Sequence, residues 1–198
     1  MEKKVIYTAD PARQQASIAM YEAQDIDVAV MDSLIDLNFL SFMEYSGGIE
    51  DLKFARVDAD AEAFSDTSAQ AASDEQQKAM QDLFRDATHQ NELQVKLGAL
   101  KDADLPAMLT QDEQGRRFND MSRIYGQDFK MPETSTLLLN QNNAVVKHLM
   151  NGADDTESKE MIASQIYDLA RLSTRPLEKD EITDFLKRSR KLLEMLCR

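Results

Sequence analysis

Two amphipathic segments near the C-terminal end of the chain, separated by Pro176, constrain its fold more than any other feature. In both segments apolar residues recur every three or four positions, so each segment carries one apolar stripe along a helix. The stripe residues are Ile162, Ile166, Leu169 and Leu172 in the first segment, and Ile182, Phe185, Leu186, Leu192, Leu193 and Leu196 in the second. The pattern predicts a helical hairpin over residues 155–198.

Two adjacent helices with apolar stripes need a surface to cover them. That surface belongs either to the same domain or to a second copy of the chain. Two such hairpins related by a two-fold axis would form a four-helix bundle and bury both stripes at once. We expect the interface to be formed by a subset of the stripe residues: Ile162, Ile166, Leu169, Ile182, Phe185, Leu186, Leu193 and Leu196.

Composition limits the partners of the chain. Of its 198 residues 42% are apolar and 30% are charged, which is typical of a globular protein with a real core. The formal charge of −13 disfavours binding to nucleic acid and to anionic membranes, because both need Lys and Arg against phosphates. No apolar run approaches the ~20 residues that cross a bilayer. The first residues lack a secretion signal and Cys197 is the only cysteine, so we expect a cytoplasmic location.

The first part of the chain alternates strand and helix patterns. The pattern predicts strands over 4–8, 27–31 and 53–57, with helices over 11–23 and 33–45. Asp10 and Pro11 are expected to cap the first helix, and Leu34, Leu37, Phe39, Leu40 and Phe42 to give the second a wide apolar face. This order predicts a small parallel βαβαβ layer, the α/β part of the fold.

Residues 58–73 change in composition to Ala, Asp, Ser, Gln and Thr, and they indicate a solvated linker. Asp58, Asp60 and Glu62 resemble the start of a calcium loop, but Ala63 and Ala69 stand where that loop needs glycine and glutamate. We therefore expect no metal there. The chain is predicted to divide into residues 1–72 and 73–198.

The second part predicts a mixed α+β domain that ends in the helical hairpin. Helices are expected over 73–86, 112–125 and 143–150, and strands over 92–97, 105–110 and 136–139, with the first two strands as neighbours. Ser73 and Gln76 suit a capping box. In the helix over 112–125, an apolar set is either core or an exposed surface for segments of other proteins. It consists of Phe118, Met121, Ile124 and Tyr125.

Catalytic motifs are missing from the sequence. The glycines fit neither phosphate-binding pattern, no serine lies in a G-x-S-x-G turn, and His89 and His148 have no partner at a metal-ligand spacing. We expect no catalytic residue, no metal and no enzyme activity in this chain. The alternative is a free-standing α/β nucleotide-binding or enzyme domain that uses the strand ends near 8–10 and 31–33.

Several segments together resemble the C-terminal part of the 90-kDa heat-shock chaperone family in its bacterial HtpG form. They are residues 5–10 (VIYTAD), 26–36 (IDVAVMDSLID), 53–57 (KFARV), 105–110 (LPAMLT), 118–124 (FNDMSRI) and 138–149 (LLNQNNAVVKHL). The last departs from the family pattern, because Gln141, Asn143 and Ala144 stand where the family often has Pro, His and Pro. The resemblance rests on the order of these segments along the chain more than on any single segment.

The resemblance implies the end of a middle domain followed by a C-terminal dimerisation domain. It implies a molecular chaperone of the stress response that binds unfolded client proteins and folds them within an ATP-driven homodimeric clamp. ATP and Mg²⁺ would bind in an N-terminal domain that this chain lacks, so no cofactor is expected here. The hairpin would join two protomers, and Phe118, Met121, Ile124 and Tyr125 would contact clients.

Overall fold

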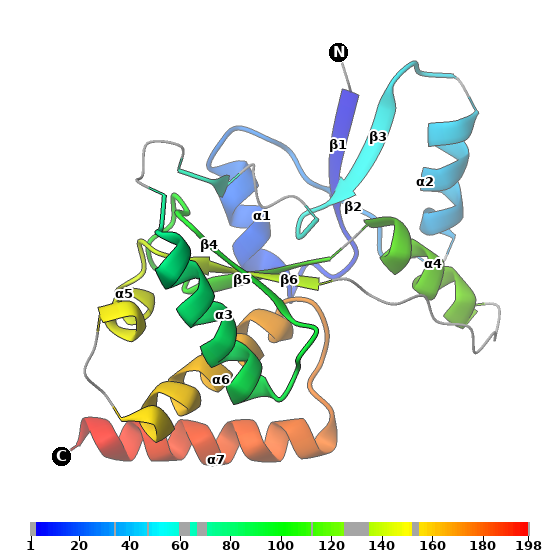
Figure 1. Ribbon diagram of the computed structural model, residues 1–198. Helices are drawn as coiled ribbons and strands as arrows, with labels where there is room; N and C mark the ends of the chain where they lie inside the picture. The colour runs from blue at the N-terminus through cyan, green and yellow to red at the C-terminus, as the bar shows by residue number, and fades with distance from the viewer. Residues whose placement is uncertain are drawn as a thin grey trace. The chain divides into compact units, whose positions relative to one another are not determined.

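The computed structural model describes residues 3–33, 35–46, 48–59, 64–66, 71–111, 113–124, 135–151 and 155–197. The contacts of the chain gather into two units (Figure 1). Unit 1 comprises Met1–Ala61 and Thr110–Thr134, and unit 2 comprises Glu62–Leu109 and Ser135–Arg198. The predicted division into folding domains 1–72 and 73–198 stays a prediction.

Unit 1 contains a three-stranded parallel sheet, as predicted. Its strands are β1 (Lys3–Thr8), β2 (Ala29–Val30) and β3 (Leu52–Arg56), in the order β2-β1-β3. Tyr7 lies opposite Ala29 on one side and opposite Arg56 on the other. The central strand β1 therefore supplies the most buried positions, among them Tyr7 and Thr8.

Three helices belong to unit 1: α1 (Gln15–Glu22), α2 (Asp36–Tyr45) and α4 (Glu113–Ile124). The prediction that Asp10 caps a helix from residue 11 is wrong. The Asp10 carboxylate accepts from the Arg13 backbone N–H at 3.1 Å and pairs with the Arg13 guanidinium, which holds a separate turn. Helix α1 begins only after this turn.

Helix α2 covers the sheet with fewer side chains than its pattern predicts. Leu40 is fully buried against Tyr7, Leu52 and Phe54, and Met43 packs beside it. Of the residues predicted to form its wide apolar face, Phe39 and Phe42 are exposed. The helix therefore has a narrow inward face and a second apolar face turned outward.

The second sheet has β6 (Ser135–Asn140) between β4 (Gln94–Gly98) and β5 (Ala107–Gln111). It belongs to unit 2, apart from the last two residues of β5. Strands β4 and β6 are parallel, with Val95 opposite Leu137. The prediction that the strands over 92–97 and 105–110 are neighbours is wrong, because β6 separates them. The end of β6 lies beside the start of β5, where the Asn140 N–H donates to the Pro106 oxygen at 2.9 Å. A strand from later in the chain thus lies between two strands that are close in sequence.

Four helices accompany this sheet: α3 (Asp74–Thr88), α5 (Ala144–Asn151), α6 (Thr156–Leu172) and α7 (Lys179–Leu196). The predicted capping box of α3 is confirmed, with the Ser73 and Gln76 side chains each accepting from the other's backbone N–H. Helices α3 and α6 pack side by side (Figure 1). Their buried residues, including Phe84 and Tyr167, join Leu137 and Leu139 of β6 in one core.

The segment predicted as a solvated linker is partly buried. Phe64 is 1% exposed within unit 2, and Ser65 next to it forms a bridge with Leu100. Asp58, predicted to lie in solvent, is buried in unit 1, where it pairs with Arg56. Asp60 and Glu62 lie outside the described residues.

Candidate functional site

Helices α6 and α7 form the predicted hairpin, and a row of polar contacts joins them. The pairs, in order along α6, are Glu157 with Lys191, Gln165 with Ser189, Asp168 with Arg188, and Arg171 with Glu181. The start of α6 thus meets the end of α7, so the two helices are antiparallel. These polar contacts link the facing sides of the two helices.

The apolar stripe of α7 is largely exposed on the outer side of the hairpin. Leu186 is 45% exposed and Leu193 is 63% exposed, and Ile182, Met195 and Leu169 of α6 are exposed to a similar degree. Exposed leucines in a row differ from the single exposed apolar residues of ordinary surfaces. The hairpin therefore presents an apolar surface that its own fold does not cover.

An apolar groove of about 500 Å³ continues this surface between α5, α6 and α7. Its lining includes Pro106, Val145, Ile162, Leu169, Leu192 and Met195. His148 and Gln165 are polar members of the lining. A groove of this kind suits the side chains of an apolar helix.

The predicted interface residues fall into a buried group and an exposed group. Ile166 is buried in the core of unit 2, and Ile162 packs against that core. Leu169, Ile182, Leu186 and Leu193 are exposed, Phe185 is half-buried, and the Leu196 side chain lies outside the described part. The residues of α7 are thus better placed than Ile166 to meet a second copy.

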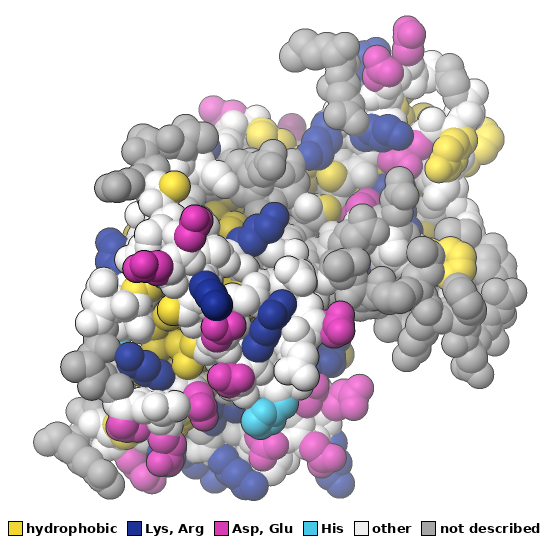
Figure 2. Space-filling view, viewed as in Figure 1, with side chains coloured by type: hydrophobic (Ala, Val, Ile, Leu, Met, Phe, Trp, Pro, Cys, Tyr) yellow, Lys and Arg dark blue, Asp and Glu magenta, His cyan; other side chains and the backbone are white. Residues whose placement is uncertain are grey.

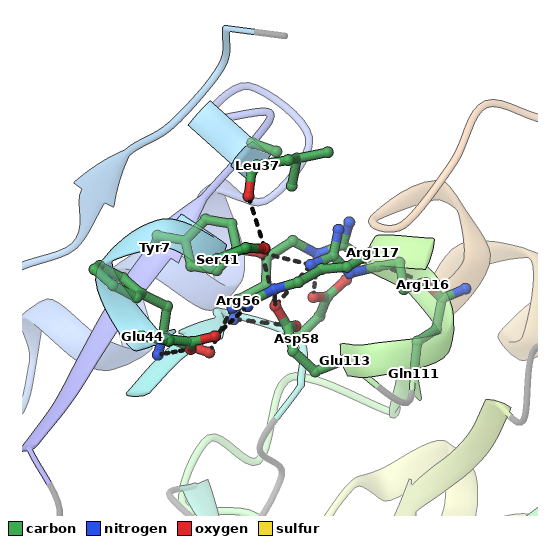
Figure 3. A network of polar contacts seen from close by, with 12 residues as sticks. Tyr7, Leu37, Ser41, Glu44, Arg56, Asp58, Gln111, Glu113, Arg116 and Arg117 are labelled. Carbon is green, nitrogen blue, oxygen red and sulfur yellow. Dashed lines mark hydrogen bonds and ion pairs between the residues drawn. The ribbon is translucent and has the colours of Figure 1, made fainter. Parts of the chain in front are cut away.

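In unit 1, a buried cluster of charged groups joins α4 to α2 and the sheet (Figure 3). The Glu113 carboxylate accepts from the Tyr7 hydroxyl at 2.7 Å and from Arg116 at 2.8 Å. Arg117 pairs with both Glu113 and Glu44 of α2, each at 2.7 Å. This cluster of Tyr7, Glu44, Glu113, Arg116 and Arg117 is called the α4 lock below.

The α4 lock keeps Glu113 ionised. Burial of the carboxyl group would raise its pKa, but the Arg116 charge, the Tyr7 hydrogen bond and the Arg117 charge outweigh burial and lower the pKa. Burial raises the pKa of the Tyr7 phenol, with Arg116 opposing and Glu113 adding to the increase. Tyr7 therefore donates its proton to a carboxylate throughout the neutral range.

A neighbouring cluster closes the carboxyl end of β1. The Thr8 hydroxyl donates to the Gln14 side-chain oxygen at 2.6 Å, and the Gln14 amide donates to Asp58 at 3.3 Å. Asp58 also pairs with Arg56, so the polar side chains at this end bind one another. Asp32 and Ser33, at the end of β2, are exposed.

Phe118 on α4, predicted to contact clients, is 41% exposed. The Met121 and Ile124 side chains and Tyr125 lie outside the described part, so that prediction remains open for them. Helix α2, which Arg117 ties to α4, adds a larger surface that the sequence prediction missed. It consists of Ile35, Phe39, Phe42 and Tyr45, and is called the α2 aromatic face.

The α2 aromatic face is exposed and flanked by acidic residues. Phe42 is 66% exposed and Tyr45 is 86% exposed. Figure 2 shows hydrophobic side chains gathered in the region where Figure 1 draws α2. Every charged residue between positions 25 and 51 is acidic: Asp25, Asp27, Asp32, Asp36, Glu44, Glu50 and Asp51. The negative potential favours apolar segments that also carry Lys or Arg.

A second missed feature is the turn between β6 and α5. Asn140 is fully buried, and its amide donates to the backbone oxygens of Asp102 and Leu105 at 2.7 and 2.8 Å. Its side-chain oxygen accepts from the backbone N–H groups of Leu100 and Asn142, both at 3.0 Å. Asn143 then caps α5 by accepting from Val145 at 3.0 Å. Side chains of Asn140 and Asn143 thus hold this turn.

The described residues form neither a metal site nor a membrane-spanning helix. Within the described residues, no group of three or more His, Cys, Asp or Glu side chains is placed to hold a metal ion. None of the helices in that part of the chain has the length and apolar character needed to cross a bilayer. His89 ends α3 and His148 lies in the last turn of α5, so both are helix-end residues.

Comparison with known proteins gives a distant relationship. The chain is similar to the chaperone HtpG. It is 27% identical over 155 residues to the protein of that name from Bacteroides fragilis, a match that covers 73% of this chain. HtpG from Bacteroides thetaiotaomicron is 27% identical over 156 residues, or 74% of this chain. No protein-family model matches.

The chain spans about a fifth of the length of these curated relatives, because the matches cover 22% and 23% of them. The similarity supports a chaperone-related region. The activity and partners of a whole chaperone are therefore matters for proposal.

Proposed function

We propose that this chain is the dimerisation and client-binding region of an HtpG-like chaperone. Two copies associate through α6 and α7 into a four-helix bundle. Joining two protomers at one end raises the effective concentration of their other parts for one another, so closure of an ATP-driven clamp becomes an intramolecular step. In this proposal ATP and Mg²⁺ bind outside the chain described here.

The observation that carries the proposal is the direction of the two faces of α7. The polar face, including Glu181 and Arg188, is used within the hairpin. The apolar face, including Leu186 and Leu193, is exposed. A soluble monomer gains nothing from this arrangement, whereas a second hairpin would bury the exposed face.

The dimer is tested by replacing both exposed leucines with aspartate. Leu186→Asp together with Leu193→Asp places four carboxylates in a symmetric apolar interface, so we expect the dissociation constant to rise roughly a hundredfold or more. Light scattering at micromolar concentration should change from the mass of a dimer to that of a monomer. Circular dichroism should remain that of the parent, because neither side chain is buried in the single copy.

Lys187→Asp is the matched control, since Lys187 is exposed on the same helix and lies about 100° around the helix from Leu186, away from the stripe. It adds a carboxylate but should leave the dimer intact. A folded double variant with the mass of a dimer would refute the interface. A monomeric parent would refute the dimer itself.

The client-binding part of the proposal rests on the α2 aromatic face and on Phe118 of the adjacent α4. Phe39, Phe42 and Tyr45 are 48%, 66% and 86% exposed. Together they present roughly 300–500 Å² of surface, if a fully exposed aromatic side chain offers about 150–250 Å². That is less than the ~800 Å² per partner of a standard interface, but it is enough for a short apolar segment. The surrounding acidic residues favour segments with basic residues.

Phe39→Ser together with Phe42→Ser should weaken client binding about tenfold, because it removes two aromatic anchors without opening the core. The measurement is the amount of protein needed to suppress aggregation of a heat-unfolded model protein, followed by light scattering. Asn38→Ser, an exposed polar change on the same helix, should have no effect. Equal suppression by the double variant and the parent would exclude this surface.

A further inference from the structure

The outer edge of β4 is covered by side chains rather than by a strand. Strand β4 lies at the end of the order β4-β6-β5, so among the described strands it has a neighbour only on the β6 side. In a parallel ladder, alternate residues direct their backbone N–H and C=O groups away from the neighbouring strand. For β4 these outward groups belong to Leu93, Val95 and Leu97.

Two glutamines of α3 bind these backbone groups. Gln81 donates to the Leu93 oxygen at 2.6 Å and accepts from the Val95 N–H at 3.2 Å. Gln77 donates to the Val95 oxygen at 2.7 Å and accepts from the Leu97 N–H at 2.8 Å. Each side-chain amide thus binds one C=O and the N–H two residues later, as a residue of a parallel strand does.

The spacing of the glutamines explains why a helix can imitate a strand here. Residues four apart on a helix lie on one side, about 6 Å apart along its axis. Residues two apart on a strand are about 6.6 Å apart. The mismatch of about 0.6 Å is small enough for flexible side chains to absorb. Gln77 and Gln81 therefore match two successive outward positions of β4.

We propose that Gln77 and Gln81 form an edge cap, which prevents β4 from pairing with the β4 strand of a second copy. An open strand edge is a template for another chain. The edge of β4 is suited to such pairing, because Leu93, Val95 and Leu97 are apolar and alternate with polar residues. This inference concerns unit 2 alone and does not depend on the proposed dimer or on client binding.

The test replaces both glutamines with methionine, which keeps side-chain length and helix propensity but removes the amides. Hydrogen exchange at the Val95 and Leu97 amides should become about tenfold faster or more. Over hours at high micromolar concentration, light scattering should show masses above that of the parent assembly, and infrared spectra should show new intermolecular β-structure. The parent should show neither change.

Lys78→Met together with Asp82→Met is the matched control, because both residues are exposed on α3 at the same spacing. It adds the same apolar groups away from β4, so association of this variant to the same extent would overturn the proposal. Faster exchange in the glutamine variant without any association would also overturn it. If the double variant does not fold, each single variant carries the same test on its half of the edge.

Discussion

Replacing Glu113 with alanine is expected to release α4 from the rest of unit 1, at a loss of about 2–4 kcal/mol of local stability. The substitution removes the acceptor shared by Tyr7, Arg116 and Arg117 and leaves their polar groups buried without it. Removing one partner of a buried ion pair is costly because the other charge remains. Hydrogen exchange followed by mass spectrometry should show reduced protection in α4 and β1.

Unit 2 serves as the internal reference in this experiment. Peptides from α3 and α6 should exchange as in the parent, because the α4 lock makes no contribution to their core. Glu50→Ala is the matched control in unit 1, since Glu50 is an exposed acidic residue. Unchanged protection of α4 in the Glu113 variant would refute the lock.

The same lock predicts a dependence of stability on pH. The pKa of Glu113 is lower in the folded chain than in the unfolded chain, so the unfolded state binds the proton more readily. The stabilisation is fully present above the ordinary pKa of glutamate and is lost as the pH falls through the folded-state pKa. The Glu113→Gln variant should be less stable than the parent at neutral pH. It should also lose less stability than the parent when the pH is lowered. If the free energy of unfolding changed with pH in the same way for parent and variant, Glu113 would not be the group responsible.

Replacing Asn140 with alanine should destabilise unit 2 by about 3–5 kcal/mol. The change removes four hydrogen bonds and leaves the buried Leu100 N–H and three partly buried backbone groups without that partner. The measurement is urea unfolding followed by circular dichroism, with exchange at Leu100 and Asn142 as a local probe. Asn91→Ala, at an exposed position, should change stability by no more than about 0.5 kcal/mol.

Asn140→Asp separates hydrogen bonding from packing. Aspartate keeps the volume and the acceptors of asparagine but cannot donate, and its charge would face the Asp102 and Leu105 oxygens. We expect it to be at least as unstable as the alanine variant at neutral pH and to recover partly on acidification. Near-parent stability for Asn140→Asp would show that the amide donors contribute little.

Local signals predicted the fold well where local chemistry decides it. The capping box at Ser73, the β-α-β-α-β order of unit 1 and the break at Pro176 depend on residues close together in the chain. The apolar stripe of α7 also follows from spacing alone, although its exposure does not. These features need no knowledge of which distant segment lies alongside.

Other features depend on tertiary contacts and could not be read from the sequence. Periodicity shows that α2 has many apolar residues, but it cannot show that Leu40 faces inward while Phe39 and Phe42 face outward. The partners of Asn140 come from a different segment, residues 100–105. The role of Glu113 needs Tyr7, 106 positions away. In each case a polar or apolar residue has several equally good local interpretations.

The grouping of α4 with unit 1 has a consequence for how the chain matures during synthesis. Arg56 and Glu113 are 57 positions apart, and both belong to unit 1. At about 5–20 residues per second, a ribosome needs roughly 3–11 s to make the residues between them. Throughout that interval Tyr7 and Glu44 lack the partners that α4 provides, so the nascent first sheet is at its most vulnerable to chaperones and proteases.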